Sequence, residues 1–301
     1  MPDTLNTPDG ERAEENELVT TDRTKQRDEE DERFVPVIVK RTDESRRHPD
    51  DMLEHAVKDG LEQIRRRGVS LTLSATAGGM ILGFTAMPVA VVAKTVAEGP
   101  WAGFSRILMA LAYPLGFVIC ILSGAQLFTE HTATAVYPVL DGKASARELL
   151  RLWLIVIVGN LLGAGIIATL LSLAEPVIAA HEGYEIVGRH LVAYPPLPLL
   201  ISAILAGWLM AQGGWLVLAT ADTTGQILCV YIATFVIGMG GFHHSIAGSV
   251  EILTACLVST RFTVTQAAAS IGMSLLGNLI GGSAFVALLN YVHIRGTQKD
   301  K

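Results

Sequence analysis

Two glycine-containing stretches of the chain, residues 123–132 and 238–251, place ionisable side chains among apolar residues. These side chains are Glu130, His131, His243, His244 and Glu251. An imidazole exchanges protons near neutral pH, and a carboxylate accepts a proton or pairs with a cation. Imidazole and carboxylate groups are also metal ligands. The residue types therefore indicate two kinds of chemistry: proton exchange with a small solute, or metal binding.

The spacing of these residues favours proton exchange. No two of the histidines show the His-x-x-x-His spacing that places two ligands on one helical face. The three cysteines, Cys120, Cys229 and Cys256, stand in apolar stretches and are expected to pack as small hydrophobic residues. We therefore expect no metal, no cofactor and no enzyme. An intramembrane metal-site protein stays open as an alternative, which the metal content of the purified protein would test.

Composition indicates that membrane-spanning elements hold these residues. Mean hydropathy is +0.42, and charged residues make up 17% of the 301 residues, against about 25% in an average soluble domain. Residues 1–68 contain 19 acidic and 13 basic residues, and the remaining 233 contain 10 of each sign. So few charges cannot cover the surface of a soluble domain of that size. The absence of a strongly basic balance also argues against a nucleic-acid partner.

Six stretches after Gly68 contain no Asp, Glu, Lys or Arg, and each supplies the roughly 20 apolar residues that cross a bilayer. They are residues 68–93, 107–129, 152–174, 190–221, 223–250 and 262–294. Basic residues gather at 65–67, at 143–151 and after 294, all on one side of a six-span chain. The positive-inside rule then predicts a multi-pass protein of the cell (inner) membrane with both termini in the cytoplasm.

The chain is expected to contain four segments. They are a disordered charged cytoplasmic tail at 1–48, an amphipathic cytoplasmic helix at 49–67, a pore domain at 68–295 and a cytoplasmic tail at 296–301. Dense charge and low hydrophobicity predict the disorder of the first tail. Leu53, Val57, Leu61 and Ile64 predict the helix because they fall on one helical face. The long tail leaves a third function open, a non-transporting membrane anchor that recruits a partner, which deletion of residues 1–48 would test.

Spans two and five are predicted to be broken helices, because glycines and ionisable side chains occur there at membrane depth. The chain also repeats itself. Gly-Asn-Leu-Leu-Gly at 159–163 returns as Gly-Asn-Leu-Ile-Gly at 277–281, and Phe128 with Ala133 returns as Phe242 with Ala247. The shared offset of about 115 residues predicts two halves of three spans, and an odd number of spans inverts the second half. Inverted repeats with broken helices are a transport architecture.

These motifs resemble those of formate/nitrite transporters. Ser-Gly-Ala-Gln-Leu-Phe-Thr at 123–129 resembles the family's Gly-x-x-Leu-Phe-Thr loop, and Gly-Phe-His-His-Ser-Ile-Ala at 241–247 resembles its Gly-Phe-x-His-Ser-Ile-Ala break. The two Gly-Asn motifs also match, and order and spacing agree from about residue 50 to residue 295. The resemblance implies an all-α, aquaporin-like protomer with its own pore, assembled as a homopentamer in the lipid bilayer. It also implies small monovalent anions, such as formate or nitrite, as substrates.

The resemblance places His244 at the central constriction, between half-helices. Protonation by His244 would let a weak acid cross as a neutral species, whereas a bare anion would face a much larger desolvation cost. Thr129 would offer a hydroxyl to the substrate or to His244. Two structural alternatives stay open. His244 could simply pack between helices, and the Thr129 hydroxyl could form a hydrogen bond only with the backbone of the broken helix.

Other residues of the motifs have expected roles in the pore or in its support. Four apolar residues are expected to line or narrow the pore: Leu127, Phe128, Ile237 and Phe242. Ile237 stands where the family carries an aromatic gate. Asn160 and Asn278 are expected to hold the broken helices through hydrogen bonds to freed backbone groups.

The chain departs from the family pattern at several positions. They are Glu130, His131, Gly207, His243, Gly248 and Glu251. Ionised carboxylates that face the pore would repel anions. They could instead form a neutral polar network with His131 and His243, or lie near water at helix ends. The fold therefore transfers better than the substrate, and a pore of the same fold for another small solute, such as ammonium, stays open.

Overall fold

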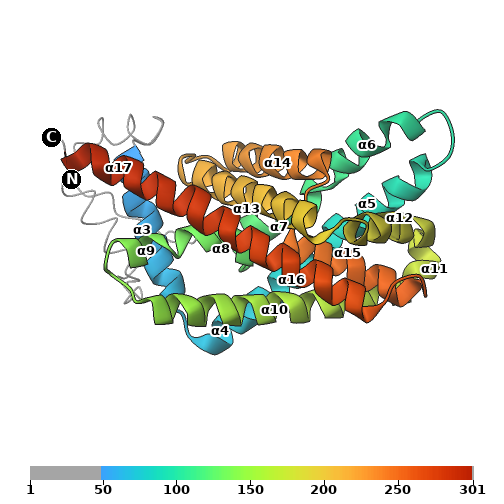
Figure 1. Cartoon of the computed structure of the whole chain (residues 1–301), viewed down its shortest axis with the longest axis horizontal. Helices are drawn as coiled ribbons and strands as arrows, with labels where there is room; N and C mark the ends of the chain where they lie inside the picture. Colours follow the sequence, from blue (N-terminus) through green and yellow to red (C-terminus); the bar gives the residue numbers. More distant parts are fainter. Residues whose placement is uncertain (1–48, 300–301) are drawn as a thin grey trace, which may run out of the picture. The chain divides into compact units, whose positions relative to one another are not determined.

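The computed structural model describes residues 49–299, and every regular element in this part of the chain is a helix (Figure 1). The predicted tail at 1–48 and the last two residues of the predicted tail at 296–301 lie outside the described residues. In chain order the helices are α3 (Pro49–Arg65), α4 (Gly68–Ile81), α5 (Gly83–Val96), the 3-10 helix η1 (Ala102–Phe104), α6 (Ser105–Ala112), α7 (Pro114–Leu122), α8 (Phe128–Thr134), α9 (Tyr137–Leu140), α10 (Ala146–Leu173), α11 (Glu175–Ile178), α12 (His181–Val192), α13 (Pro196–Leu218), α14 (Thr223–Gly240), α15 (Ser245–Val258), α16 (Val264–Ile280), the π-helix η2 (Gly281–Leu288) and α17 (Leu289–Lys299).

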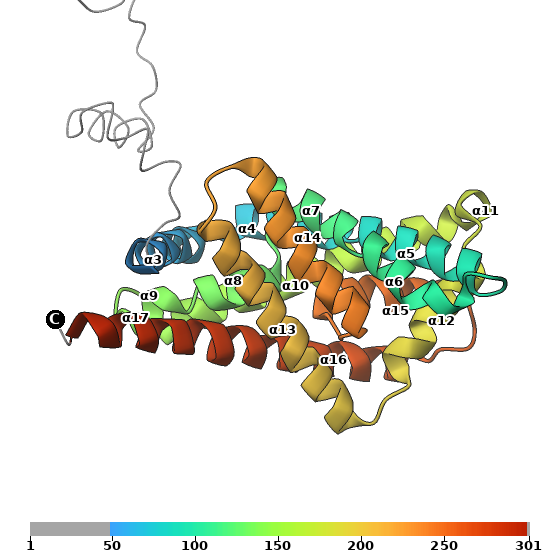
Figure 2. The same ribbon diagram turned by 90° about the horizontal axis from the view of Figure 1, so that it is seen from above.

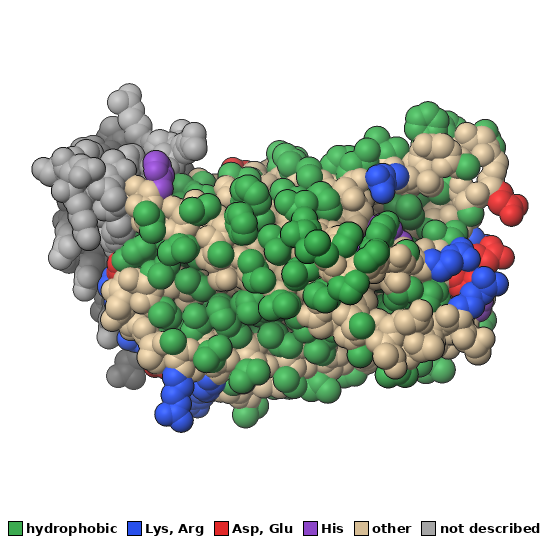
Figure 3. All heavy atoms as spheres, in the orientation of Figure 1, with side chains coloured by type: hydrophobic (Ala, Val, Ile, Leu, Met, Phe, Trp, Pro, Cys, Tyr) green, Lys and Arg blue, Asp and Glu red, His purple; other side chains and the backbone are tan. Residues whose placement is uncertain are grey.

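Six helical stretches are long and apolar enough to cross a membrane, which confirms the predicted number of spans. They are Gly68–Val96, Ala102–Leu122, Ala146–Leu173, Pro196–Leu218, Thr223–Gly240 and Val264–Ile294. On the face shown in Figure 3, apolar side chains cover the middle of the molecule, and most charged side chains gather towards its ends. This distribution suits a protein whose middle lies in hydrocarbon.

The sequence missed the helix α12 between the third and fourth spans. The charge-free stretch 190–221 was expected to be a single span, but residues 190–192 end α12, and the span begins only at Pro196. Absence of charge could not separate the two helices, because His190, Leu191 and Val192 are as uncharged as the span that follows.

Matching capping boxes start the third and sixth spans. At the start of α10 the Ser145 hydroxyl accepts from the Glu148 backbone N–H, and the Glu148 carboxylate accepts from the Ser145 N–H. Thr263 and Gln266 make the same exchange at the start of α16, 118 residues later. Each box satisfies backbone donors that a helix N-terminus leaves free.

Close helix packing also occurs twice. The helix α4 packs mainly against α10, and α13 packs mainly against α16. A Cβ atom at Gly163 would overlap the carbonyl oxygen of Thr76, and one at Gly281 would overlap that of Ile204. Figures 1 and 2 show α10 and the α16–η2–α17 rod as the long helices of the bundle.

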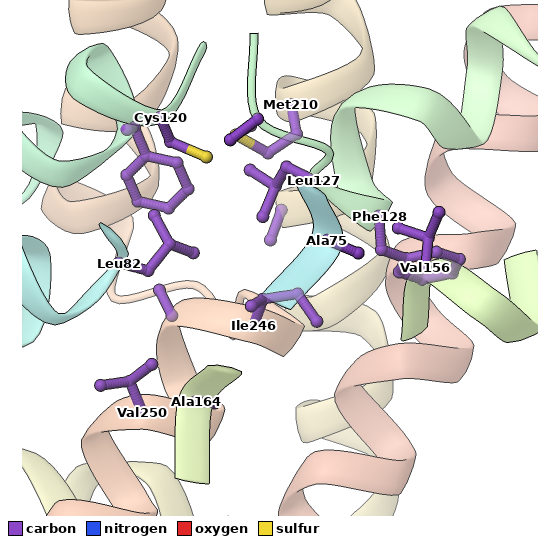
Figure 4. Packing of buried hydrophobic residues seen from close by; sticks show 14 of the residues in the cluster. Ala75, Leu82, Cys120, Leu127, Phe128, Val156, Ala164, Met210, Ile246 and Val250 are labelled. Carbon is purple, nitrogen blue, oxygen red and sulfur yellow. The ribbon is translucent and has the colours of Figure 1, made fainter. Parts of the chain in front are cut away.

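The largest group of buried apolar side chains lies where α4, α7, α8, α10, α13 and α15 meet. Figure 4 shows part of this group, including Leu82, Leu127 and Ile246. A second group joins α3 to the helices beside it through Leu53, Val57 and Ile294. The two half-length helices α8 and α15 are therefore set inside the bundle, where their N-termini are enclosed by apolar side chains.

Candidate functional site

Two short loops interrupt helices in the middle of the bundle. The first loop, residues 123–127, lies between α7 and α8, and the second, residues 241–244, lies between α14 and α15. Gly124 and Gly241 have φ values of 67° and 63°. This left-handed conformation is strained for residues with a side chain, so glycine permits both turns.

An asparagine holds each loop. Asn160 of α10 accepts a hydrogen bond from the Phe128 backbone N–H at 2.9 Å, and donates to the carbonyl oxygens of Ala75 at 2.7 Å and Gln126 at 2.8 Å. Its side chain is fully buried. These three bonds connect the first span, the third span and the first loop, and they satisfy backbone groups that the interrupted helix leaves free.

Asn278 of α16 makes the corresponding bonds in the second half. It accepts from the Ser245 N–H at 2.7 Å and donates to the carbonyl oxygens of Ala203 at 2.8 Å and His243 at 3.0 Å. The backbone of Asn278 also approaches Gly207 so closely that a Cβ atom there would overlap it. Gly79 stands in the same relation to Asn160. The contact explains the glycine at position 207, where the sequence departs from the family pattern.

Thr129 and His244 meet where the two half-length helices begin. The Thr129 hydroxyl oxygen lies 2.8 Å from Nε2 of His244, and both residues are buried. The Ala247 backbone N–H donates to Nδ1 of His244 at 3.2 Å, so His244 is the N-cap of α15. With Nδ1 acting as an acceptor, the proton of a neutral ring sits on Nε2. Nε2 then donates to Thr129.

Apolar side chains surround this pair. The ring of Phe117 meets that of His244 edge-on, with 4.8 Å between the ring centroids. Leu127 and Phe128 are fully buried, but they point to different places. Figure 4 shows Leu127 next to Met210, and Phe128 on the other side of the loop, towards Val156 of α10. The narrowing of a pore by these two residues stays a prediction.

A cavity of about 270 Å³ opens beside His244. It is lined by Val89, Ser105, Arg106, Met109, Tyr113, Ile186, Val187, His190, Leu191, Ile237, Gly238, Gly241, Phe242, His244 and Glu251. Four residues singled out from the sequence are thus brought to one space: Ile237, Phe242, His244 and Glu251. These side chains come from α14, α15 and the loop between them, so the second loop forms one side of the cavity wall.

The other ionisable residues lie elsewhere. His131 donates from Nδ1 to the Leu127 carbonyl oxygen at 3.0 Å and stays on α8 beside Glu130. The Ser202 hydroxyl oxygen lies 2.8 Å from Nδ1 of His243, and the His243 ring stacks on His190, with 5.4 Å between ring centroids. The four residues considered for one polar network, Glu130, His131, His243 and Glu251, are therefore split among three places. These residues are separated because side chains that are neighbours in the sequence at a loop point to opposite sides of that loop.

Three ionisable residues of the cavity wall were not predicted from the sequence: Arg106, Tyr113 and His190. His190 ties α12 to the second loop, since its Nε2 donates to the Gly241 carbonyl oxygen at 2.9 Å and its Nδ1 accepts from the Tyr194 hydroxyl at 3.1 Å. The polarity of His190 in a charge-free stretch was the only available signal. No sequence signal pointed to Arg106 and Tyr113, because their position at the cavity depends on how α6 packs against α14.

Within residues 49–299, no group of three or more His, Cys, Asp or Glu side chains is placed to hold a metal ion. The metal-site alternative therefore gains no geometric support from this part of the chain.

Comparisons with known proteins agree with this architecture. The family model for formate/nitrite transporters matches residues 50–292. The inner membrane protein YfdC of Escherichia coli is 31% identical over 254 residues, which cover 82% of this chain and 79% of YfdC. The structure of an FNT family ion channel matches with a TM-score of 0.71 at 18% identity, over 81% of this chain and 99% of that one. A pentameric formate channel with formate bound matches with a TM-score of 0.62 at 20% identity, over 76% of this chain and 98% of that one.

The structural matches show the fold, and the sequence matches show the family. They confirm the resemblance seen in the four motifs, the all-helical membrane fold and the expectation of a transporter or channel instead of an enzyme. The chain belongs to the formate/nitrite transporter family.

Proposed function

We propose that the chain forms a pore for small monovalent anions of weak acids, such as formate or nitrite, and that His244 exchanges a proton with the solute. The observation that carries the proposal is the Thr129–His244 hydrogen bond of 2.8 Å, buried where two half-length helices meet. Family membership supports the substrate class, and so does the formate bound in one of the structural matches.

Two states of His244 account for proton exchange. In the neutral ring, Nδ1 accepts from Ala247 and Nε2 donates to Thr129. A second proton on Nδ1 removes the hydrogen bond from Ala247, because one nitrogen cannot hold a proton and accept one. Transfer of a proton from the cationic ring to an anion yields a neutral acid and restores the cap on α15. The neutral acid then crosses apolar surroundings at a much lower desolvation cost than the anion.

Two features favour anions on the cavity side. The α15 helix has 14 residues and begins beside His244, so the positive end of its dipole lies next to this residue. Arg106 lines the same cavity and is exposed to solvent. A basic side chain at a cavity mouth raises the local concentration of anions.

We also propose a homopentamer in the inner membrane with cytoplasmic termini. The pentameric state of a structural match and the membrane of the relative YfdC support the first two points. The positions of basic residues support cytoplasmic termini. The Arg65–Arg67 run ends α3, and Arg151 lies beside Gly68, so the basic side chains of two loops share one end of the bundle.

Stopped-flow uptake into proteoliposomes tests the proposal. Formate, nitrite, acetate, hydrosulfide and ammonium would be offered to wild-type protein and to His244→Ala from about pH 5 to pH 8. We expect saturable anion flux that rises as the pH falls, and a loss of at least about tenfold in His244→Ala. The matched control is His181→Ala, which removes an exposed histidine of α12 outside the cavity.

Unchanged anion flux in correctly assembled His244→Ala protein would exclude the proton-exchange mechanism. Flux of ammonium without anion flux would exclude the substrate class. Ammonium is the second candidate solute, because Glu251 places a carboxyl group on the wall of the cavity.

A further inference from the structure

Glu251 is the one acidic side chain on the wall of the cavity that contains His244. It is only 5% exposed. His244 caps α15, and Glu251 lies seven residues further along that helix. Seven residues are two turns, so the two side chains share one helix face and are separated by about 10 Å along its axis.

The cavity joins the two residues, because both line it. Gly248 occupies the intermediate turn, and a Cβ atom there would have Leu191 as its only neighbour within 4 Å, at 3.6 Å. Leu191 itself lines the cavity. A glycine at position 248, where the sequence departs from the family pattern, therefore leaves Leu191 as the side chain between that turn and the cavity.

The Glu251 carboxyl group has neither a hydrogen-bond donor nor a counter-charge in the described part of the chain. No hydrogen bond or ion pair of residues 49–299 involves it. An ionised carboxylate is costly to bury without a donor or counter-charge. A carboxyl group in this position therefore requires a proton, or a ligand that enters the cavity.

The other titratable or charged groups on the cavity wall are Arg106, Tyr113, His190 and His244. They come from α6, the α6–α7 junction, α12 and the N-cap of α15. Neighbouring α5 contributes only Val89, and α10 and α16 contribute no residue. Arg106 is exposed and forms no ion pair with Glu251. His190 is committed at both ring nitrogens to Gly241 and Tyr194.

We propose that Glu251 is a proton-binding residue that controls anion access to His244 from the cavity side. As a carboxylic acid, Glu251 donates its O–H to one oxygen of a small carboxylate or nitrite anion. As a carboxylate, it repels the same anion. Access to His244 then requires a proton on Glu251. The inference rests on the proposed function, because it assigns the anion a binding position on the way to His244.

Infrared difference spectroscopy of the full-length protein in bilayers tests the binding step without relying on transport. The film would be perfused with buffer with and without ¹³C-labelled formate, and the C=O stretch of protonated carboxyl groups would be followed. We expect formate to shift one such band in the wild-type protein, and Glu251→Gln to lose that shift. Glu130→Gln is the matched control, since it removes a half-buried carboxyl group that lies on α8 and does not line the cavity. It should keep the shift.

A second variant and a flux measurement complete the test. Glu251→Asp keeps the carboxyl with a shorter side chain, so it should keep a protonated band even where Glu251→Gln fails to assemble. In proteoliposomes, Glu251→Gln should lower the ratio of formate flux at pH 5.5 to that at pH 7.5 by at least about threefold, because a neutral amide no longer titrates.

The inference is wrong if formate shifts no carboxyl band, or if the shift survives in Glu251→Gln. It is also wrong if ammonium instead of formate perturbs the carboxyl group, because Glu251 then acts as a counter-charge for a cation. Failure of the proposed function would look different. Wild-type protein would show no anion flux at any pH, whatever the infrared spectra show.

Discussion

Asn160 beside the loop between α7 and α8, and Asn278 beside the loop between α14 and α15, make corresponding sets of three hydrogen bonds to the loop, to the helix that follows it and to a neighbouring span. The surroundings of the two loops differ. The first is covered by α3, since Gln126 donates from Nε2 to the Gln63 side-chain oxygen at 2.7 Å. The second opens on the cavity that Arg106 and Glu251 line. The two halves thus repeat the scaffold that holds an interrupted helix, while the groups suited to binding a solute gather beside the second loop only.

The largest expected effect comes from removing either asparagine. Asn160→Ala and Asn278→Ala each remove three buried hydrogen bonds, and they leave the Phe128 or Ser245 backbone N–H and the Gln126 or His243 carbonyl group without this partner. We expect each variant to lose about 2–4 kcal/mol of stability, by similar amounts. The measurement is the fraction of protein that keeps its assembled state after heating in detergent. A severe loss in one variant and none in the other would show that the two loops are not equivalent scaffolds.

The next largest effect concerns the contact between the two halves. Thr129→Val removes the hydroxyl that meets His244 and keeps nearly the same side-chain shape. We expect the formate uptake rate in proteoliposomes to fall about tenfold, as for the loss of one buried hydrogen bond.

Thr132→Val is the matched control for that substitution. The Thr132 hydroxyl donates to the Thr129 carbonyl oxygen within its own helix, at 3.0 Å. Flux should stay close to that of the wild type. Equal losses in both variants would show that the Thr129 hydroxyl serves helix structure and not the solute.

A smaller effect is expected when the side chain that forms a hydrogen bond to each loop is replaced. Gln63→Ala removes the acceptor for Gln126 and should raise amide hydrogen exchange in residues 123–127 about threefold to tenfold, with little change in residues 241–244. His190→Phe removes the bond to Gly241 and should have the opposite pattern. Exchange that rises in both loops for either variant would show that the loops open together.

The smallest effect concerns the far end of α15. The Ser259 hydroxyl, which follows that helix, donates to Glu185 of α12 at 2.7 Å, and Arg261 lies 3.1 Å from the same carboxylate. The Ser259 hydrogen bond, assisted by Arg261, holds the pKa of Glu185 below its ordinary value. The contribution to stability is therefore complete above the ordinary glutamate pKa and is lost as the pH falls through the lowered value.

Thermal unfolding as a function of pH measures this contribution. At neutral pH, Glu185→Gln should lower Tm by about 1–2 °C relative to the wild type. The difference should vanish in acid, where both side chains are uncharged. A difference that persists in acid would show that the carboxylate charge is not its source.

The sequence predicted the membrane fold well, because the signals for it are local. Charge-free stretches of about 20 residues follow from bilayer thickness, so they predict six spans without knowledge of their packing. Motifs such as those around Asn160 and Asn278 were equally visible, since they recur at a fixed offset. Local signals failed at α12, where two uncharged helices follow each other with only a short connection.

The residues of the candidate site were only partly predictable. The types and spacing of Thr129 and His244 singled them out, although 115 residues separate them. The sequence did not predict that Glu251 lines the same cavity as His244. It also did not predict that His243, the immediate neighbour of His244, contacts Ser202 instead.

Residue types and hydrophobic stretches by themselves determined that this is a six-span membrane protein with two interrupted helices of similar motif. Only the tertiary structure decided which ionisable side chains meet. The direction of a side chain at a helix interruption depends on the loop backbone and on the helices packed against it, such as α6 and α12 around the cavity. Those contacts join residues far apart in the chain, and for that reason no local pattern encodes them.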